Sequence, residues 1–293
     1  MNFADKLATR IKNIESCLCA GIDPRPELMP DCFIQEADKE SRTTEEFIYQ
    51  LLTNFYFTSL EAIKNQVACT KPNAAFFEQY GIAGIKALQS ILSWCKEQDI
   101  PTILDAKRGD IGSTAEAYSR SILGKQSFLG RECLAYEADS MTVNPFLGFD
   151  TLEPFLNDCI EYSKGIFILV KTSNPGSSAL QETTSDKIAK WIGKNSEKLQ
   201  GSCGLSGLGA VVGATYPEEA KELRQLMPNS FFLIPGLGAQ GGTISDAKAG
   251  FTSSGKGGVV NASRGIFSKP EYKSLDKEKF LSVIKKTTAV LLQ

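Results

Sequence analysis

The hydrophobic positions of this chain fall into short, nearly continuous runs that alternate with longer mixed stretches. Runs that are apolar on both faces and bounded by turn residues are typical of buried parallel strands. They predict eight strands, at Cys17–Asp23, Ala68–Asn73, Thr102–Lys107, Met141–Pro145, Ile166–Thr172, Ala210–Ala214, Phe231–Pro235 and Gly258–Ala262.

The stretches between these runs have helical patterns of apolar and polar residues. They predict helices at Glu45–Asn65, Gly81–Glu97, Thr114–Leu123, Thr151–Tyr162, Ser185–Leu199, Pro217–Leu226, Thr243–Ala249 and Lys277–Leu291. Two of these starts carry helix N-terminal signals, because Ser185 is followed by the acidic Asp186 and Pro217 by Glu218 and Glu219.

Strand and helix alternate eight times, which predicts a (β/α)8 TIM barrel, an α/β fold, built as a single domain by residues 1–293. A doubly wound open sheet is the alternative, and it would place a G-x-G-x-x-G motif after the first strand. The first strand ends instead in Gly21-Ile22-Asp23-Pro24, so the barrel is favoured.

Composition and charge narrow the class of protein. The net charge of −2 does not favour nucleic acid or an anionic membrane as a partner. The amino-terminal residues lack the apolar core of a signal peptide, and no stretch reaches the ~18 apolar residues of a membrane span. Eight scattered cysteines are expected to be reduced thiols in a cytoplasmic protein, since the one close pair, Cys17 and Cys19, has no second pair to complete a metal site.

The chain contains no histidine. This excludes Ser-His-Asp and Cys-His catalysis, histidine general bases and histidine-ligated metals. Proton transfer must therefore fall to Lys, Asp, Glu, Tyr or Cys side chains.

Polar residues gather where the predicted strands end. Strand side chains alternate, so Asp105 and Lys107 are expected to point to the same side, with Asp110 just beyond the strand. Burial of unpaired charge is costly, so a site that gathers three charged groups at the end of an apolar strand usually uses them. A functional role is therefore favoured for this cluster over a purely structural ion pair. Other polar residues at or just past strand ends are Asp23, Lys71, Asn144, Thr172 and Ser173. Because barrel active sites are built at this face, these side chains are expected to converge on one site.

The last two strands carry a candidate phosphate site. Pro235–Gly242, with Gln240, Gly241 and Gly242, follows the seventh strand, and glycines let backbone N–H groups approach a ligand. Arg264 follows the eighth strand and offers a guanidinium suited to bidentate phosphate contact. The loops at these two strand ends are the usual phosphate site of a barrel.

Together these motifs resemble the orotidine 5'-phosphate decarboxylase family. The Asp105-x-Lys107-x-x-Asp110 signature, the Pro-Gly-x-Gly-Ala-Gln-Gly-Gly loop and the Arg after strand eight agree in order and spacing. The sequences of Val143–Gly148 and Thr172–Gly176 are similar to those of the longer bacterial branch of the family. The resemblance spans essentially the whole chain.

The resemblance implies decarboxylation of orotidine 5'-phosphate to UMP and carbon dioxide, the last step of UMP biosynthesis, without metal or cofactor. Asp23 and Lys71 would hold the ribose hydroxyls and the charge network. Asp105 would lie against the substrate carboxylate, and Lys107 would protonate carbon 6 of the pyrimidine.

The remaining implied roles concern the dimer, the base and the phosphate. Asp110 would cross a homodimer interface into the partner's site, with Thr114 near the same ribose. Asn144, Ser173 and Gln240 are the other expected substrate contacts, the last two at the base. Gln240 would also reach the phosphate, which Gly241, Gly242 and Arg264 would bind.

Three alternatives stay open. A sister barrel that uses Mg²⁺ to stabilise an enediolate, a sugar-phosphate decarboxylase or aldolase, would share the Asp-Lys-Asp signature and the phosphate loop. A Schiff-base aldolase could use Lys171, although strand alternation predicts that Lys171 faces the helices. A non-catalytic nucleotide-binding module would need no lysine among carboxylates.

Overall fold

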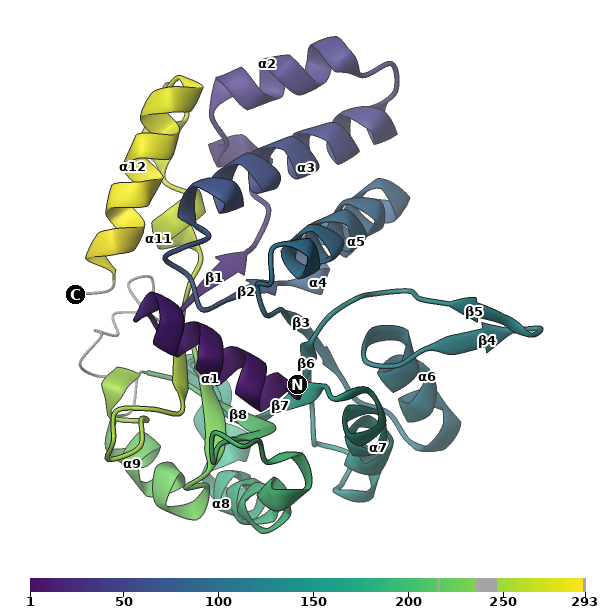
Figure 1. The fold of residues 1–293 in the computed structure, drawn as a ribbon, viewed down its shortest axis with the longest axis vertical. Coiled ribbons are helices and arrows are strands. Elements are labelled where there is room, and N and C mark those ends of the chain that lie inside the picture. Colours follow the sequence, from purple (N-terminus) through teal and green to yellow (C-terminus); the bar gives the residue numbers. More distant parts are fainter. Residues whose placement is uncertain (215–216, 236–246, 292–293) are drawn as a thin grey trace.

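The computed structural model describes residues 1–214, 217–235 and 247–291. Its central feature is a ring of eight parallel strands in the order β2-β1-β10-β9-β8-β7-β6-β3 (Figure 1). Isolated parallel bridges from Thr70 to Thr102 and from Asn73 to Asp105 join β2 to β3. The strands are β1 Leu18–Ile22, β2 Cys69–Pro72, β3 Ile103–Arg108, β6 Ser140–Val143, β7 Gly165–Lys171, β8 Ser206–Val212, β9 Ser230–Ile234 and β10 Gly258–Ala262. This is the predicted (β/α)8 barrel, and all eight predicted strands are confirmed.

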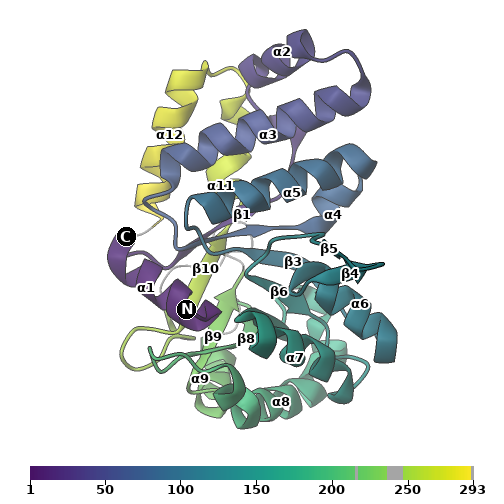
Figure 2. The same cartoon turned by 45° about the vertical axis from the view of Figure 1, so that its right-hand side comes forward.

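Helices surround the strands on the outside of the barrel (Figures 1 and 2). The α-helices are α1 Phe3–Ile14, α2 Asp31–Glu40, α3 Thr44–Ile63, α4 Ala74–Glu78, α5 Gly81–Glu97, α6 Gly112–Ile122, α7 Glu153–Tyr162, α8 Ser178–Asn195, α9 Pro217–Leu226, α11 Arg264–Phe267 and α12 Lys277–Val290. Short 3-10 turns lie at Pro26–Leu28, Asp150–Leu152, Pro175–Ser177, Ser196–Leu199 and Pro270–Tyr272. A two-stranded hairpin, β4 Gln126–Phe128 and β5 Arg131–Cys133, projects beside α6.

The predicted helices that fall within the described residues are present, most with bounds shifted by one to three residues, and one helix and one strand differ more. The helix predicted to start at Ser185 starts at Ser178 instead, and the Ser185 hydroxyl is no cap because it donates to the Val170 carbonyl inside the fold. Strand β8 begins at Ser206, four residues before the predicted Ala210. Its additional residues are small ones such as Gly207, and they are buried in the sheet. The helix predicted at Thr243–Ala249 lies mostly outside the described residues.

Helix α1, which the sequence pattern did not predict, closes the end of the barrel where the strands begin (Figure 1). Asn2 caps it by accepting from the Asp5 N–H, and Phe3 packs edge-on against Phe167 inside the barrel at 5.9 Å between ring centroids. Gly165 makes room for this ring, because a Cβ there would lie 2.3 Å from Phe3 Cδ1. The base of the barrel is therefore sealed by apolar packing.

Helix α2 also went unpredicted. It packs on α3 and α12 through aromatic rings, with Phe33 lying 5.3 Å from Phe55 and 5.8 Å from Phe280. Helix α3 begins with a capping box, since Thr43 and Glu46 each bond the other's backbone N–H. These contacts extend the core outside the barrel on the side of β1.

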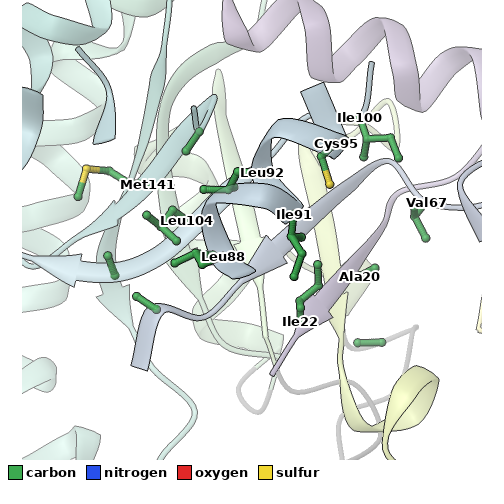
Figure 3. Packing of buried hydrophobic residues seen from close by; sticks show 14 of the residues in the cluster. Ala20, Ile22, Val67, Leu88, Ile91, Leu92, Cys95, Ile100, Leu104 and Met141 are labelled. Carbon is green, nitrogen blue, oxygen red and sulfur yellow. The ribbon is translucent and has the colours of Figure 1, made fainter. Parts of the chain in front are cut away.

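Helix α5 shows how the outer layer is held (Figure 3). Leu88, Ile91 and Leu92 are fully buried against the strands, near Ile22 of β1 and Leu104 of β3. Full burial of a leucine or isoleucine side chain contributes about 2 kcal/mol. The outer face of the strands is therefore committed to packing against the helices.

Two expectations from composition can be compared with the structure. All eight cysteines are free thiols, as predicted. In the described ranges, no helix is long and apolar enough to cross a membrane.

Arg224 in α9 is a buried cation that organises the turns around β9 and β10. Its guanidinium stacks on Phe232, 3.6 Å from the ring centroid. It donates at 2.7 to 2.9 Å to four backbone carbonyls, those of Met227, Ser230, Gly250 and Gly257. A single side chain thus satisfies acceptors from three consecutive turns.

We predict that Arg224→Met lowers the free energy of unfolding by about 3 kcal/mol, because buried carbonyls lose their donors. Urea unfolding followed by circular dichroism measures this. The matched control is Lys221→Met on the same helix, which removes an exposed side chain paired with Glu218 and should change stability by less than about 0.5 kcal/mol. Equal stability of the two variants would contradict the role given to Arg224.

Candidate active site

The carboxylate of Asp105 is the centre of a charge network at the inner wall of the barrel. Its Oδ2 accepts from Lys71 Nζ at 2.8 Å, and its Oδ1 accepts from Lys107 Nζ at 2.5 Å. Asp105 and Lys71 are buried, whereas the Lys107 side chain is 48% exposed. The structure therefore brings together three of the predicted residues, and Lys107 is the one that solvent or a ligand can reach.

The two lysines set the ionisation of this network. Burial by itself would raise the pKa of the Asp105 carboxyl, but Lys71 and Lys107 outweigh burial and hold that pKa well below its usual value. Burial would likewise lower the pKa of Lys71, but Asp105 and Asp23 outweigh it and raise that pKa to about 12. At neutral pH the Asp105 carboxylate and the Lys71 ammonium are thus both ionised.

Strand β3 departs from regular geometry at this point. Leu104 pairs with Met141 and Arg108 with Val143, so three residues of β3 face the single residue Thr142 of β6. Lys107 adopts a positive φ of 47°, a left-handed conformation that costs about 1 kcal/mol or more for a side chain with a Cβ. Asp105 and Lys107 thus lie on the same side, as expected, although the regular alternation on which that expectation was based does not hold at Lys107.

Thr142 is the residue of this network that sequence reasoning missed. Its hydroxyl donates to Asp105 Oδ1 at 2.9 Å and accepts from the Lys107 N–H at 2.9 Å. A threonine inside a strand pattern is indistinguishable from an ordinary β-branched residue, so its sequence neighbours did not single it out.

A second polar group lies where β1 and β10 end. Asp23 Oδ2 accepts from Ser263 Oγ at 2.6 Å, and its other oxygen is buried without a hydrogen-bond partner among the described residues. Asn261 Oδ1 is likewise buried without a hydrogen-bond partner among the described residues. Gly21 packs closely against Asn261 and Ser263, because a Cβ at this position would lie 2.8 Å from both Asn261 Oδ1 and Ser263 Cβ. Asn261 and Ser263 were not predicted, and their inward position in the last strand is the signal that was available.

Three further predicted residues follow strands β3 and β6 along the chain. Asp110 Oδ1 accepts from the next backbone N–H, that of Ile111, and Thr114 is exposed in the first turn of α6. Asn144 is exposed, and its Oδ1 accepts from the Phe146 N–H. Within one chain, none of the three contacts Asp105 or its lysines through a bond between described residues.

The remaining predicted residues belong to the last four strands. Ser173 is half-buried after β7, beside Gly213 after β8. Arg264 is exposed at the start of α11 and makes no ion pair with any described residue. Gln240, Gly241 and Gly242 lie outside the described residues.

Lys171 points away from the site. Its Nζ lies 2.8 Å from Glu219 Oε2 of α9, on the helical side of β7. The prediction that Lys171 faces the helices is confirmed, and this removes the structural basis for a Schiff base at this lysine.

The site can stabilise negative charge and deliver a proton. Lys107 presents an ammonium at the open end of the network, and Asp105 is held ionised beside it. An ammonium fixed by a carboxylate is suited to face a developing carbanion. In the part of the chain that the structure describes, no three cysteine or acidic side chains gather to hold a metal ion.

Comparisons with known proteins agree with this geometry. Residues 18–274 match the family model described as "Orotidine 5'-phosphate decarboxylase / HUMPS family". The chain is 40% identical over 290 residues to a protein of Caldicellulosiruptor bescii named orotidine 5'-phosphate decarboxylase, covering 95% of this chain and 94% of the relative. A protein of the same name from Rhodopirellula baltica is 40% identical over 272 residues, 91% and 88% of the two chains. The solved structure of the Leishmania donovani OMP decarboxylase superposes with a TM-score of 0.71 at 29% identity, covering 99% of this chain and 98% of that one.

The ion pair predicts a specific pH dependence of stability. Lys71 binds its proton more tightly in the folded chain, so its contribution is complete below pH 10.5 and is lost as the pH rises through about 12. A pKa of about 12 in place of 10.5 corresponds to about 2 kcal/mol. The difference in unfolding free energy between the native chain and Lys71→Met should therefore narrow above pH 10.5. Urea unfolding at a series of pH values measures this difference in unfolding free energy, and Lys96→Met, at an exposed lysine, is the control. A difference between the native chain and Lys71→Met that stays constant up to pH 12 would refute the interpretation.

Proposed function

The chain belongs to the orotidine 5'-phosphate decarboxylase / HUMPS family and converts orotidine 5'-phosphate to UMP in the last step of UMP biosynthesis, and we propose that Lys107 is its proton donor. The enzyme is a carboxy-lyase. The magnesium-dependent sugar-phosphate alternative is not favoured, because relatives matched over nearly their whole length are named orotidine 5'-phosphate decarboxylase.

The observation that carries the proposal is the Asp105 carboxylate held between Lys71 and Lys107 at the carboxyl ends of the strands. Loss of carbon dioxide leaves an electron pair in an sp² orbital at carbon 6, where no adjacent carbonyl can accept it by conjugation. The Lys107 ammonium faces this developing charge, and once the C–C bond to carbon dioxide has broken it transfers a proton to carbon 6, where the electron pair forms the new C–H bond and Lys107 is left as a neutral amine. We propose that the protein supplies this stabilisation itself, without metal or cofactor.

Asp105 makes a smaller contribution, through the substrate carboxylate. Two like charges about 4 Å apart at an effective dielectric constant of ~20 repel by about 4 kcal/mol. Relief of that repulsion is worth at most about a thousandfold in rate. Attraction between Lys107 and the transition state, together with binding energy from the distant phosphate, therefore carries more of the acceleration.

The other predicted residues surround this centre as substrate contacts. Asp23, with its unpartnered buried oxygen, is suited to accept from a ribose hydroxyl. Asn144 and Ser173 follow strands β6 and β7, and Arg264, unpaired among the described residues, is suited to bind the phosphate. Gln240, Gly241 and Gly242 complete the proposed phosphate and base contacts.

We propose that the working form is a homodimer in the cytoplasm, with Asp110 and Thr114 reaching the partner's site. Ile111 and Phe146 are 62% and 76% exposed, and such apolar side chains at one face support an interface there. The two loops that carry them touch, since a Cβ at Gly109 would lie 2.6 Å from the Asn144 carbonyl oxygen. Eight free thiols support a reducing compartment.

The first test is turnover of orotidine 5'-phosphate by the purified chain, followed by ultraviolet absorbance with excess EDTA. We expect full activity in EDTA and a loss of at least about 10⁴-fold in kcat for Lys107→Ala, because both charge stabilisation and proton transfer are removed.

The control for Lys107→Ala is Lys125→Ala on the hairpin, where the side chain is exposed and pairs with Glu132. It should retain native turnover. Near-normal turnover by folded Lys107→Ala would exclude the proton-donor role, and inactivity in EDTA that Mg²⁺ restores would exclude metal independence.

The shared site predicts complementation between two inactive variants. In a mixed dimer of Lys107→Ala and Asp110→Ala chains, one site combines the intact Lys107 of one chain with the intact Asp110 of the other. Random pairing should therefore restore roughly a quarter of native activity after the variants are unfolded and refolded together. Each variant refolded alone is the control. If the mixture is no more active than its components, Asp110 does not act across an interface.

A further inference from the structure

The bulge in β3 leaves a backbone donor that the sheet does not satisfy. Between the pairs Leu104–Met141 and Arg108–Val143, the ladder from β3 to β6 is interrupted. The Lys107 N–H, displaced from the ladder by its positive φ, donates to the hydroxyl of Thr142 instead of a carbonyl. This hydroxyl therefore takes over the position of a missing ladder bond.

The same hydroxyl fixes the carboxylate that holds the Lys107 ammonium. Thr142 Oγ1 donates to Asp105 Oδ1 at 2.9 Å, the oxygen that also accepts from Lys107 Nζ. Thr142 thus holds Lys107 at two points: directly at its backbone, and through Asp105 at its side chain. Its side chain is 1% exposed and both hydrogen bonds point within the protein, so a substrate contact is not its role.

We propose that Thr142 is a positioning residue for the decarboxylation, which sets where the Lys107 ammonium stands relative to carbon 6. The inference rests on the proposed role of Lys107 as proton donor. Without the hydroxyl, the Lys107 N–H has no buried acceptor, and the costly left-handed conformation loses the bond that maintains it. A displacement of about 1 Å at a reacting group can cost about a hundredfold in rate.

The test compares Thr142→Val, which keeps the shape of the side chain without its hydroxyl, with Thr142→Ser, which keeps the hydroxyl. We expect Thr142→Val to lower kcat by roughly 10- to 100-fold with KM changed less than about threefold, because the residue touches Lys107 and Asp105 and not the bound phosphate. Thr142→Ser should recover most of that kcat. A fall in activity that follows only the fraction of folded protein, or an equal loss in the serine variant, would overturn the proposal.

A matched control is Thr70→Val in β2, whose buried hydroxyl contacts Cys95 Sγ at 3.4 Å on the helical side of the sheet. It should show the stability effect of losing a buried hydroxyl while kcat remains native. Equal kcat losses in Thr70→Val and Thr142→Val would assign both effects to packing and refute positioning.

A double variant separates this inference from the proposed function. If Thr142 acts through Lys107, Thr142→Val should change the residual rate of Lys107→Ala by less than about threefold, since the group it positions is already absent. Full additivity of the two losses would overturn the inference and leave the role of Lys107 intact. Native turnover by Lys107→Ala alone would instead refute the proposed function on which the inference rests.

Discussion

A carboxylate buried in a protein interior is costly unless opposite charge and hydrogen bonds compensate it, and the compensation of Asp105 organises this site. Lys71 reaches it from β2, Lys107 from β3 and the Thr142 hydroxyl from β6. The barrel brings these strand ends together, and the pair from Lys71 to Asp105 spans the junction of β2 and β3, where two isolated bridges join the ring. The charge pair thus serves the closure of the barrel as well as the electrostatics of the site.

Three features of the site are unfavourable for the folded state. Asp23 Oδ1 and Asn261 Oδ1 are buried without partners among the described residues, and Lys107 holds an unfavourable backbone conformation. Each feature costs stability, and such costs are concentrated where a protein prepares for a ligand. The stable part of the fold lies elsewhere, in the aromatic core of α2, α3 and α12, in the α5 layer and in the sealed base. This division lets one face of the barrel be strained without loosening the whole.

Most of the fold could be predicted because buried parallel strands leave an unmistakable apolar signal, and α5 was predicted with its observed bounds. Helix α1 could not be predicted, because its buried residues Phe3, Ala4 and Leu7 pack against barrel residues that are distant in the sequence. In the site, charge and strand position identified Lys71, Asp105 and Lys107. Thr142 and the bulge opposite it could not be found, because a strand pattern assumes regular alternation. The position of Asp110 relative to a second site depends on another chain, which one sequence does not contain.

The amino-terminal helix has a consequence for the order in which the protein is made. Phe3 leaves the ribosome well before Gly165 and Phe167, on which its ring packs, because these residues lie more than half of this chain's length further along the sequence. Until then α1 is an amphipathic segment without its binding surface, exposed to chaperones and proteases. Contacts of such long sequence separation slow folding, so the base of the barrel should be completed late, after the strands that form it have assembled.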